Sequence, residues 1–307
     1  MGMGMTFPKT SEGKGPSFVI RAVLAVVAAL AGLVVLAKRR FRRQVRREVA
    51  KLFAQAGAAL GPEDLRRREA SLPEPVRQHL RNVISEGAPA LRTAQLRHDG
   101  TFRFSPRQPW RPIQGQQYFT VEPPGFLWNA TIRLAPALWV EARDCLLEGR
   151  GSMLVKINST LTVADAQGPN MDQGSTMRWL AETVWFPYGF LSERITWEPI
   201  DERSARATLR DGGPPVSLVF TLEGGTFGTV SGTRYYEPEG RVRPWKGCCR
   251  DYRGFSGFRV PSSIEVSWEL DEGDFSYAQF QLSQLEYNVA FPVWKEASAS
   301  RNRSALA

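Results

Sequence analysis

The sequence contains few of the side chains that bind metals or react as nucleophiles. Among 307 residues there are two isolated histidines, His79 and His98, and three cysteines. No C-x-x-C pair occurs, so no recognised metal-ligand spacing is present. Cys145 is single and Cys248 adjoins Cys249, an arrangement that does not suit a disulfide framework. This scarcity excludes a zinc-finger or disulfide-stapled domain and weakly favours a reducing compartment.

The signatures of common catalytic sites are also missing. The sequence has no G-x-S-x-G motif, no phosphate-binding loop and no dinucleotide-binding glycine pattern at a strand–helix junction. The weak candidates for acid–base or thiol chemistry are Asp144 and Glu148, four residues apart in a predicted strand region, and Cys248 beside basic residues. We therefore expect a non-enzymatic protein with no cofactor and no metal. An enzyme with an unrecognised site is the least favoured alternative.

The basic excess is confined to one end of the chain. The formal net charge is +9, from 40 Lys and Arg against 31 Asp and Glu. Residues 1–51 hold eleven basic and two acidic side chains, so they carry the entire excess, and the rest of the chain has 29 of each sign. A nucleic-acid binder carries its basic excess on the folded domain. We therefore exclude nucleic acid as a partner.

One long apolar run lies near the N-terminus. Residues 22–37 (AVLAVVAALAGLVVLA) contain no polar side chain. With residues 18–21, a helix would be about 30 Å long, which matches the hydrocarbon layer of a bilayer. A cleaved signal peptide is the alternative, because residues 35–37 loosely fit a cleavage site, but dense positive charge directly after them opposes export. We predict one transmembrane helix over residues 18–37 in a bacterial inner (cytoplasmic) membrane.

Basic residues follow the apolar run directly, and we expect them to contact anionic lipid at the membrane surface. The predicted surface residues are Lys38, Arg39, Arg40, Phe41, Arg42, Arg43, Arg46 and Arg47. The other flank carries only Lys9, Lys14 and Arg21. The positive-inside rule therefore predicts a cytoplasmic location for the domain that follows.

The helix is expected to continue beyond the membrane with one apolar face. That face consists of Phe41, Val45, Val49, Leu52 and Phe53. A basic helix of this kind lies in the bilayer interface or packs on its own domain, and both alternatives remain open. A further short helix is predicted near residues 73–84. His79 falls off its apolar stripe, which predicts a surface histidine.

From about residue 91 the apolar pattern changes to a period of two. Residues 126–134, 216–222 and 264–270 alternate between apolar and more polar side chains, as in antiparallel strands with one buried face. The apolar phase slips between Tyr277 and Phe280 and again between Leu282 and Leu285. These slips predict β-bulges, which bend a sheet.

The predicted organisation is a single α+β, mostly β, domain behind an anchor. Its parts are a polar tail (1–17), the transmembrane helix (18–37), basic juxtamembrane and connecting helices (38–90), a curved antiparallel β domain (91–292) and a polar tail (293–307). About eight to ten strands are expected. One helix that begins at Ser175 or Thr176, with an inner stripe from Met177 to Val184, is expected to pack on the sheet.

Several stretches resemble a bacterial, membrane-anchored family of unknown function. They are LPEPVR (72–77), QYF (117–119), PPGFLW (123–128), MRWLAETVWFP (177–187), SARATL (204–209) and DYR (251–253). This resemblance covers about residues 72–290 and implies no activity. The closing strands, from FRVP (258–261) to Asn288, are similar to the lipoprotein-carrier (LolA/LolB-like) fold. That second resemblance implies a half-barrel around a helix with an apolar cavity for acyl chains. Such carriers are usually periplasmic, which conflicts with the charge-based orientation.

Nine tryptophans are many for this length. The aromatic residues at apolar positions are the candidate lining of an apolar cavity: Phe126, Trp128, Trp139, Trp185 and Trp268. Trp110 and Trp245 are expected in proline-flanked loops beside cations, which makes them candidates for a partner interface. Packing against those cations on the protein's own surface is the alternative.

These features predict an accessory or scaffolding subunit of a larger membrane protein assembly. The alternative is a membrane-tethered carrier or binding module for a lipid or another apolar ligand. The expected partners are the membrane itself, other membrane protein subunits and an apolar small molecule.

Overall fold

The computed structural model describes residues 16–290. The predicted C-terminal tail and residues 1–15 of the predicted N-terminal tail lie outside the described residues. The helices are α1 (Pro16–Ala54), α2 (Pro62–Arg68), η1 (Glu69–Ser71), α3 (Glu74–Val83), α4 (Pro169–Glu182), η2 (Thr183–Trp185), η3 (Pro187–Leu191) and η4 (Glu237–Glu239), where η denotes a 3₁₀-helix.

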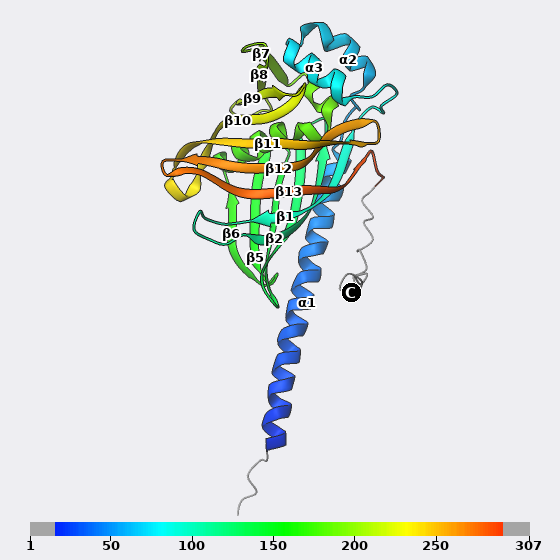
Figure 1. Cartoon of the computed structure of the whole chain (residues 1–307). Coiled ribbons are helices and arrows are strands. Elements are labelled where there is room, and N and C mark those ends of the chain that lie inside the picture. The colour runs from blue at the N-terminus through cyan, green and yellow to red at the C-terminus, as the bar shows by residue number, and fades with distance from the viewer. Residues whose placement is uncertain (1–15, 291–307) are drawn as a thin grey trace, which may run out of the picture.

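The strands form one antiparallel sheet with the order β6-β5-β4-β3-β2-β1-β13-β12-β11-β10-β9-β8-β7. Their bounds are β1 (Thr93–Phe102), β2 (Arg111–Thr120), β3 (Gly125–Ala135), β4 (Leu138–Leu147), β5 (Arg150–Ile157), β6 (Leu161–Gln167), β7 (Ile195–Pro199), β8 (Ser204–Leu209), β9 (Val216–Glu223), β10 (Thr226–Tyr236), β11 (Arg241–Phe255), β12 (Phe258–Leu270) and β13 (Gly273–Tyr287). The sheet curves strongly, so β11 to β13 run across the molecule while β5 and β6 point in roughly the same direction as the axis of α1 (Figure 1).

The mostly β fold with a curved antiparallel sheet and one long apolar helix is confirmed. Both predicted bulges are present: Tyr277 is the extra residue opposite β12, and Ser283 is the extra residue opposite β1. The strand number is 13, more than expected. The extra strands were hard to recognise because β7 and β8 are short, and because β6 is exposed along nearly its whole length and so has no apolar alternation.

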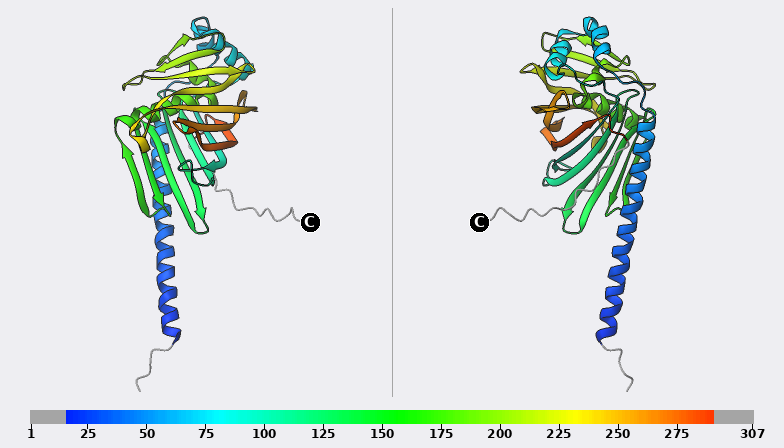
Figure 2. Two further views of the ribbon diagram at one scale, coloured as in Figure 1. Left: turned by 60° about the vertical axis from the view of Figure 1, so that its left-hand side comes forward. Right: turned by 90° about the vertical axis from the view of Figure 1, so that its right-hand side faces the viewer.

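The sheet has an inner, concave face covered by α4 and an outer, convex face covered by the second half of α1 (Figure 2). On the inner face, one large core combines the apolar rows of the strands with α4, η2 and η3. α4 begins at Pro169, six residues before the expected start, directly after Gly168, whose φ of 107° favours glycine. The expected stripe is buried, since Met177, Leu180, Ala181 and Val184 are at most 7% exposed.

The second half of α1 packs on the outer face of the sheet. Phe41, Val45, Val49 and Leu52 are buried against a row of strand residues. That row consists of Tyr118, Leu127, Cys145 and Leu154. Of the two alternatives for this helix, the structure therefore shows packing on its own domain, and the interfacial alternative is wrong. The assignment of Phe41 to the membrane surface is wrong for the same reason.

The predicted surface position of His79 is also wrong. Its side chain is fully buried, because its ring packs against Phe190 of η3 and Phe227 of β10. The ring stacks on Phe227 at 4.1 Å between ring centroids, and Nδ1 accepts a hydrogen bond from the Phe227 backbone N–H at 3.0 Å. His98 on β1 is buried as well, and its Nε2 accepts a hydrogen bond from Trp128 Nε1 at 2.9 Å.

These two buried histidines make the stability depend on pH. Burial lowers the pKa of His79 and of His98 to about 3, below the value of about 6.5 in an unfolded chain. Between these values the unfolded state binds more protons, so the free energy of unfolding decreases as the pH falls. Each histidine is expected to remove about 2 kcal/mol of stability between pH 7 and pH 5.

Urea unfolding of the detergent-solubilised protein, followed by tryptophan fluorescence, tests this dependence. His79→Gln keeps a hydrogen-bond acceptor but removes the titration, so its loss of stability over that range should be smaller by about 2 kcal/mol. A variant with the same pH dependence as the unmodified protein would contradict a neutral, buried His79.

Candidate functional site

Aromatic side chains fill the part of the inner face beneath α4, η2 and η3. Trp179, Phe186 and Phe190 are fully buried there. Phe186 lies 4.8 Å from Phe119 and 5.5 Å from Trp179 between ring centroids, so these helical segments are joined to the sheet by close ring contacts. This part of the inner face is a solid core.

A buried ionic cluster ties α4 to the strands. Arg178 on α4 donates to Asp144 on β4 at 2.8 Å and to Glu182 at 2.9 Å. Gln117 on β2 donates to Glu182 at 2.5 Å. The guanidinium also lies over the rings of Phe126 and Trp128, at 5.0 and 4.8 Å from their centroids. One cation therefore holds two carboxylates and two aromatic rings together.

The protonation of this cluster follows from its burial and its charges. Burial alone would lower the pKa of Arg178, but the charges of Glu182 and Asp144 outweigh that effect and raise the pKa above its ordinary value. Burial raises the pKa of Glu182, and Arg178 offsets this only in part. The arginine is therefore a permanent cation whose charge is already matched, which makes the cluster a structural tie and a poor site for acid–base catalysis.

Towards the β1–β2, β3–β4 and β5–β6 turns, the inner face carries apolar side chains that are only half-buried. We call this set the open inner patch. It consists of Leu134, Val155 and Ile157 on β3 and β5, and Phe102, Tyr277 and Phe280 on β1 and β13. Apolar groups left half-exposed on a concave surface are typical of sites for apolar ligands.

Aromatic contacts organise the β13 side of this patch. Tyr277 stacks on Trp268 with 6.3 Å between ring centroids, and Phe102 meets Tyr277 edge-on at 5.9 Å. Trp245 donates from Nε1 to the Tyr277 hydroxyl at 3.1 Å. These contacts hold the rings in fixed positions, so the β13 side of the patch is preformed.

The structure divides the predicted cavity residues among three places. Phe126, Trp128 and Trp185 lie in the solid core, and Trp268 borders the open inner patch. Trp139 lies on the outer face, where the Nζ atom of Lys38 is 4.9 Å from its ring centroid. Its placement in a cavity was wrong because it has the strand parity of Arg143 and Cys145, which face α1.

The two predicted interface tryptophans, Trp110 and Trp245, both lie near β13. Trp245 is a buried residue within β11 and not a loop residue. Trp110 remains half-buried beside β2, with the Arg103 guanidinium 4.6 Å from its ring centroid and also near Phe275 at 5.2 Å. For Trp110 the structure therefore shows the cation–π alternative, and an interface role for either residue stays a prediction.

The three weak catalytic candidates are not brought together. Asp144 is enclosed in the ionic cluster, whereas Glu148 lies in the β4–β5 turn and pairs with Lys51 on the outer face. Burial raises the pKa of the Cys248 thiol and raises that of Cys249 to about 12, so neither is a thiolate at neutral pH. Among the described residues no group of three or more His, Cys, Asp or Glu side chains is placed to hold a metal ion.

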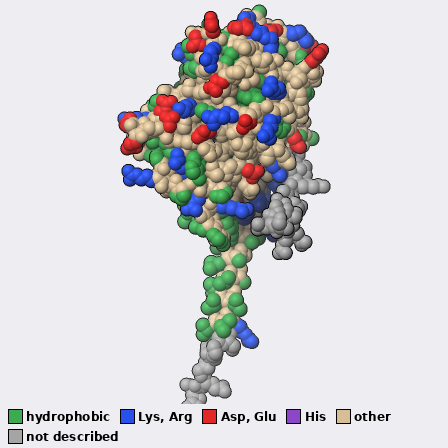
Figure 3. Space-filling model, viewed as in Figure 1, with side chains coloured by type: hydrophobic (Ala, Val, Ile, Leu, Met, Phe, Trp, Pro, Cys, Tyr) green, Lys and Arg blue, Asp and Glu red, His purple; other side chains and the backbone are tan. Residues whose placement is uncertain are grey.

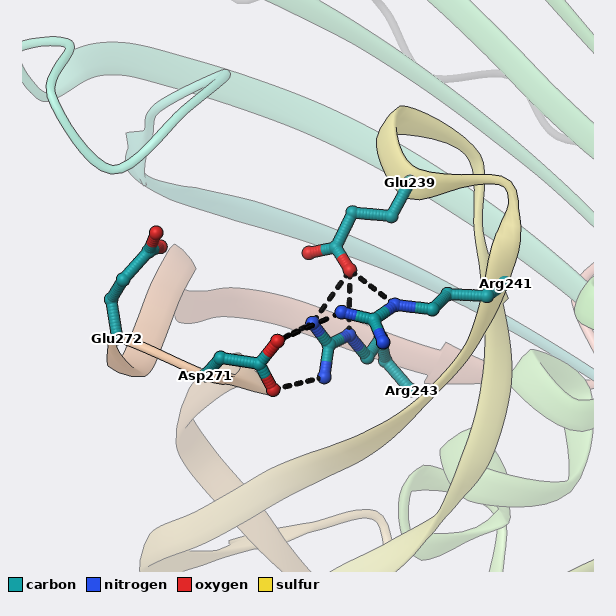
Figure 4. A pocket seen from close by; sticks show the side chains of 5 residues that line it. All are labelled: Glu239, Arg241, Arg243, Asp271 and Glu272. Carbon is teal, nitrogen blue, oxygen red and sulfur yellow. Dashed lines mark hydrogen bonds and ion pairs between the residues drawn. The ribbon is translucent and has the colours of Figure 1, made fainter.

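A second charged group lies at the ends of β11 and β12 (Figure 4). It consists of Glu239, Arg241, Arg243, Asp271 and Glu272. Arg243 donates to both carboxylate oxygens of Asp271 at 2.5 and 2.6 Å, and Glu239 accepts from both arginines. The hydrogen bonds from Arg243 and Arg241 lower the pKa of Asp271. Because both arginines are already paired, the group is a surface ion-pair network.

Residues 65–280 match a protein family that is described as a family of unknown function (DUF6544). The chain belongs to this family. The expected resemblance over about residues 72–290 to a family of unknown function is thereby confirmed. No curated protein matches the DUF6544 chain.

Three solved structures align with most of the chain at low sequence identity. A putative outer membrane lipoprotein-sorting protein domain from Vibrio parahaemolyticus aligns with a TM-score of 0.39 and 11% identity, over 75% of this chain and 93% of that chain. A DUF1329 family protein from Desulfovibrio piger aligns with a TM-score of 0.42 and 11% identity, over 73% of this chain and 94% of that chain. A LolA superfamily protein from Nitrosomonas europaea aligns with a TM-score of 0.37 and 10% identity, over 70% of this chain and 93% of that chain.

Removal of the buried cation tests the ionic cluster. Arg178→Ala leaves Asp144 and Glu182 buried without their partner, and we expect the free energy of unfolding to fall by about 3–5 kcal/mol. Arg150→Ala is the matched control, because Arg150 pairs with Asp172 but is 82% exposed at its side chain, and such pairs contribute about 1 kcal/mol or less. Equal losses in the two variants, measured by urea unfolding, would refute the role of Arg178.

Proposed function

We propose that this DUF6544 protein is a membrane-anchored, non-enzymatic binding module that holds a lipid or another apolar molecule on the inner face of its sheet. The observation that carries the proposal is the open inner patch. Six apolar side chains there remain half-buried, whereas Trp179, Phe186 and Phe190 beneath the helices of the same face are fully buried. Concave, mainly apolar surfaces with few polar groups are the usual form of such sites.

The first half of α1 supports the anchor. It is one helix that is long and apolar enough to cross a membrane, and none of its apolar window is buried in the protein. Leu24, Leu30 and Leu36 are each 56–62% exposed, and a row of exposed leucines is unfavourable in water but suited to lipid. The membrane is proposed to be the bacterial inner membrane, with the domain on the cytoplasmic side as the flanking charges predict.

The basic residues after the apolar run suit the proposed lipid surface. Arg39, Arg40, Arg43, Arg46 and Arg47 are exposed on α1, while Lys38 is half-buried on Trp139. Their number and their position directly after the apolar run support contact with anionic lipid.

A role as an accessory subunit of a membrane assembly is the second candidate. It is favoured by β6, an edge strand whose outer hydrogen-bonding side faces no other strand of the sheet. Edge strands of this kind can pair with a strand of another subunit.

Cross-linking with a photoactivatable fatty acid tests the ligand-binding proposal. With the full chain in lipid nanodiscs, cross-links should map to β3, β5 and β13. Phe280→Glu places a charge in the open inner patch and is expected to reduce cross-linking at these strands about tenfold, because burying a charge beside an acyl chain costs more than about 1.4 kcal/mol.

Gln281→Glu is the matched control. It introduces the same charge one residue further along β13, at an exposed position on the opposite face, and should cross-link within about twofold of the unmodified protein. Equal cross-linking of the Phe280→Glu and Gln281→Glu variants would overturn the proposed site.

A further inference from the structure

The β3–β4 and β5–β6 hairpins lie at the level of the predicted membrane boundary. α1 and β4 run side by side in the same direction, as three contacts in order along both elements show. These are Lys38 with Trp139, Glu48 with Arg143 and Lys51 with Glu148. Lys38 is the first residue after the apolar run. Trp139 is therefore level with the end of that run, and the strands beside it run down along α1 toward its apolar half (Figure 1).

The two turns are joined into one rigid structure by Asn158. Its backbone N–H donates to the Trp139 carbonyl at 2.9 Å, and its side-chain oxygen accepts from the Trp139 N–H at 3.0 Å. Its Nδ2 donates to the Ala137 carbonyl at 3.1 Å. We call this joined structure, residues 136–139 and 157–163, the rim.

The rim exposes apolar side chains beside cations. Leu138, Leu161 and Val163 are 38%, 61% and 51% exposed. They make up three of the six large apolar side chains that are exposed outside α1 within residues 16–290. Lys38 lies on Trp139, and Lys156 directly precedes Ile157 in the chain. Hydrophobic surface continues from α1 onto the lower edge of the domain (Figure 3). Apolar tips, a tryptophan and flanking lysines are the features that favour the interface of a bilayer.

We propose that the rim is a lipid-contacting surface that rests in the head-group region of the same bilayer that α1 spans. This inference depends on the proposed anchor and adds a second contact with the membrane. It also has a consequence for the binding site. Leu134 and Ile157 of the open inner patch directly adjoin the two turns, so the rim would bring the edge of the patch next to the bilayer.

Site-specific labels test the rim in the full-length protein. In a Cys248→Ser background, in which Cys145 and Cys249 are buried, an environment-sensitive fluorophore is attached after Leu138→Cys or Leu161→Cys. The protein is reconstituted in vesicles of phosphatidylethanolamine and phosphatidylglycerol that contain nitroxide-labelled lipid. Leu30→Cys in the anchor is the positive control, and Glu202→Cys, exposed in the β7–β8 turn, is the negative control.

Labels at positions 138 and 161 should be quenched by the nitroxide lipid at least half as strongly as the label at position 30, and should be protected from aqueous iodide. Labels at 138 and 161 that behave like the label at 202, while the label at 30 is quenched, would overturn the rim and leave the anchor standing. An unquenched label at position 30 would instead overturn the anchor, and the proposed function with it.

Discussion

The packing of α1 on the outer face of the sheet joins the apolar half of the helix to the folded domain. Four side chains in this contact, from Phe41 to Leu52, are at most 8% exposed. Burial of each contributes about 1.5–3 kcal/mol, so the contact is far stronger than thermal energy. Because α1 is one unbroken helix from Pro16 to Ala54, no hinge separates the two halves. An anchor of this kind orients the domain as well as holding it.

That orientation gives the two ends of the inner face different roles. The end beneath α4 is closed by aromatic packing and by Arg178, which holds Asp144 and Glu182 in the core. The other end keeps its apolar side chains half-buried and adjoins the turns nearest to the apolar run of α1. A packed end gives the sheet its rigidity, and an open end leaves apolar surface for a ligand. The continuous helix turns the open end toward the proposed bilayer.

Local patterns in the sequence were sufficient for much of the fold. The apolar run, the alternating strands, the bulges at Tyr277 and Ser283 and the inner stripe of α4 are all consequences of side-chain period, which tertiary contacts do not change. The position of His79 was not predictable in this way, because α3 is enclosed on two sides by elements more than a hundred residues away. The strand count was predicted too low, because the apolar alternation is weak in β6 and because β7 and β8 are short.

The candidate site was less accessible from sequence, because it depends on which face each strand presents. Trp128 and Trp139 are both aromatic strand residues, yet they lie on opposite faces of the sheet. The sequence shows that Trp139 lies on the opposite face of its strand from Val140 and Ala142. Which of these two faces is the inner one becomes clear only when the position of α1 is known. Arg178 and Glu182 form a recognisable i, i+4 pair, whereas Asp144 joins them only in the folded sheet.

Hydrogen exchange of the full chain in lipid nanodiscs tests whether α1 and the domain form one rigid unit over the bilayer. The backbone amides of residues 41–53 should exchange as slowly as those of β3 and β4, because their helix is covered by the sheet on one side and anchored at both ends. Exchange of residues 41–53 at the rate of a solvent-exposed helix, while β3 and β4 stay protected, would show that the domain is only tethered and would contradict the account.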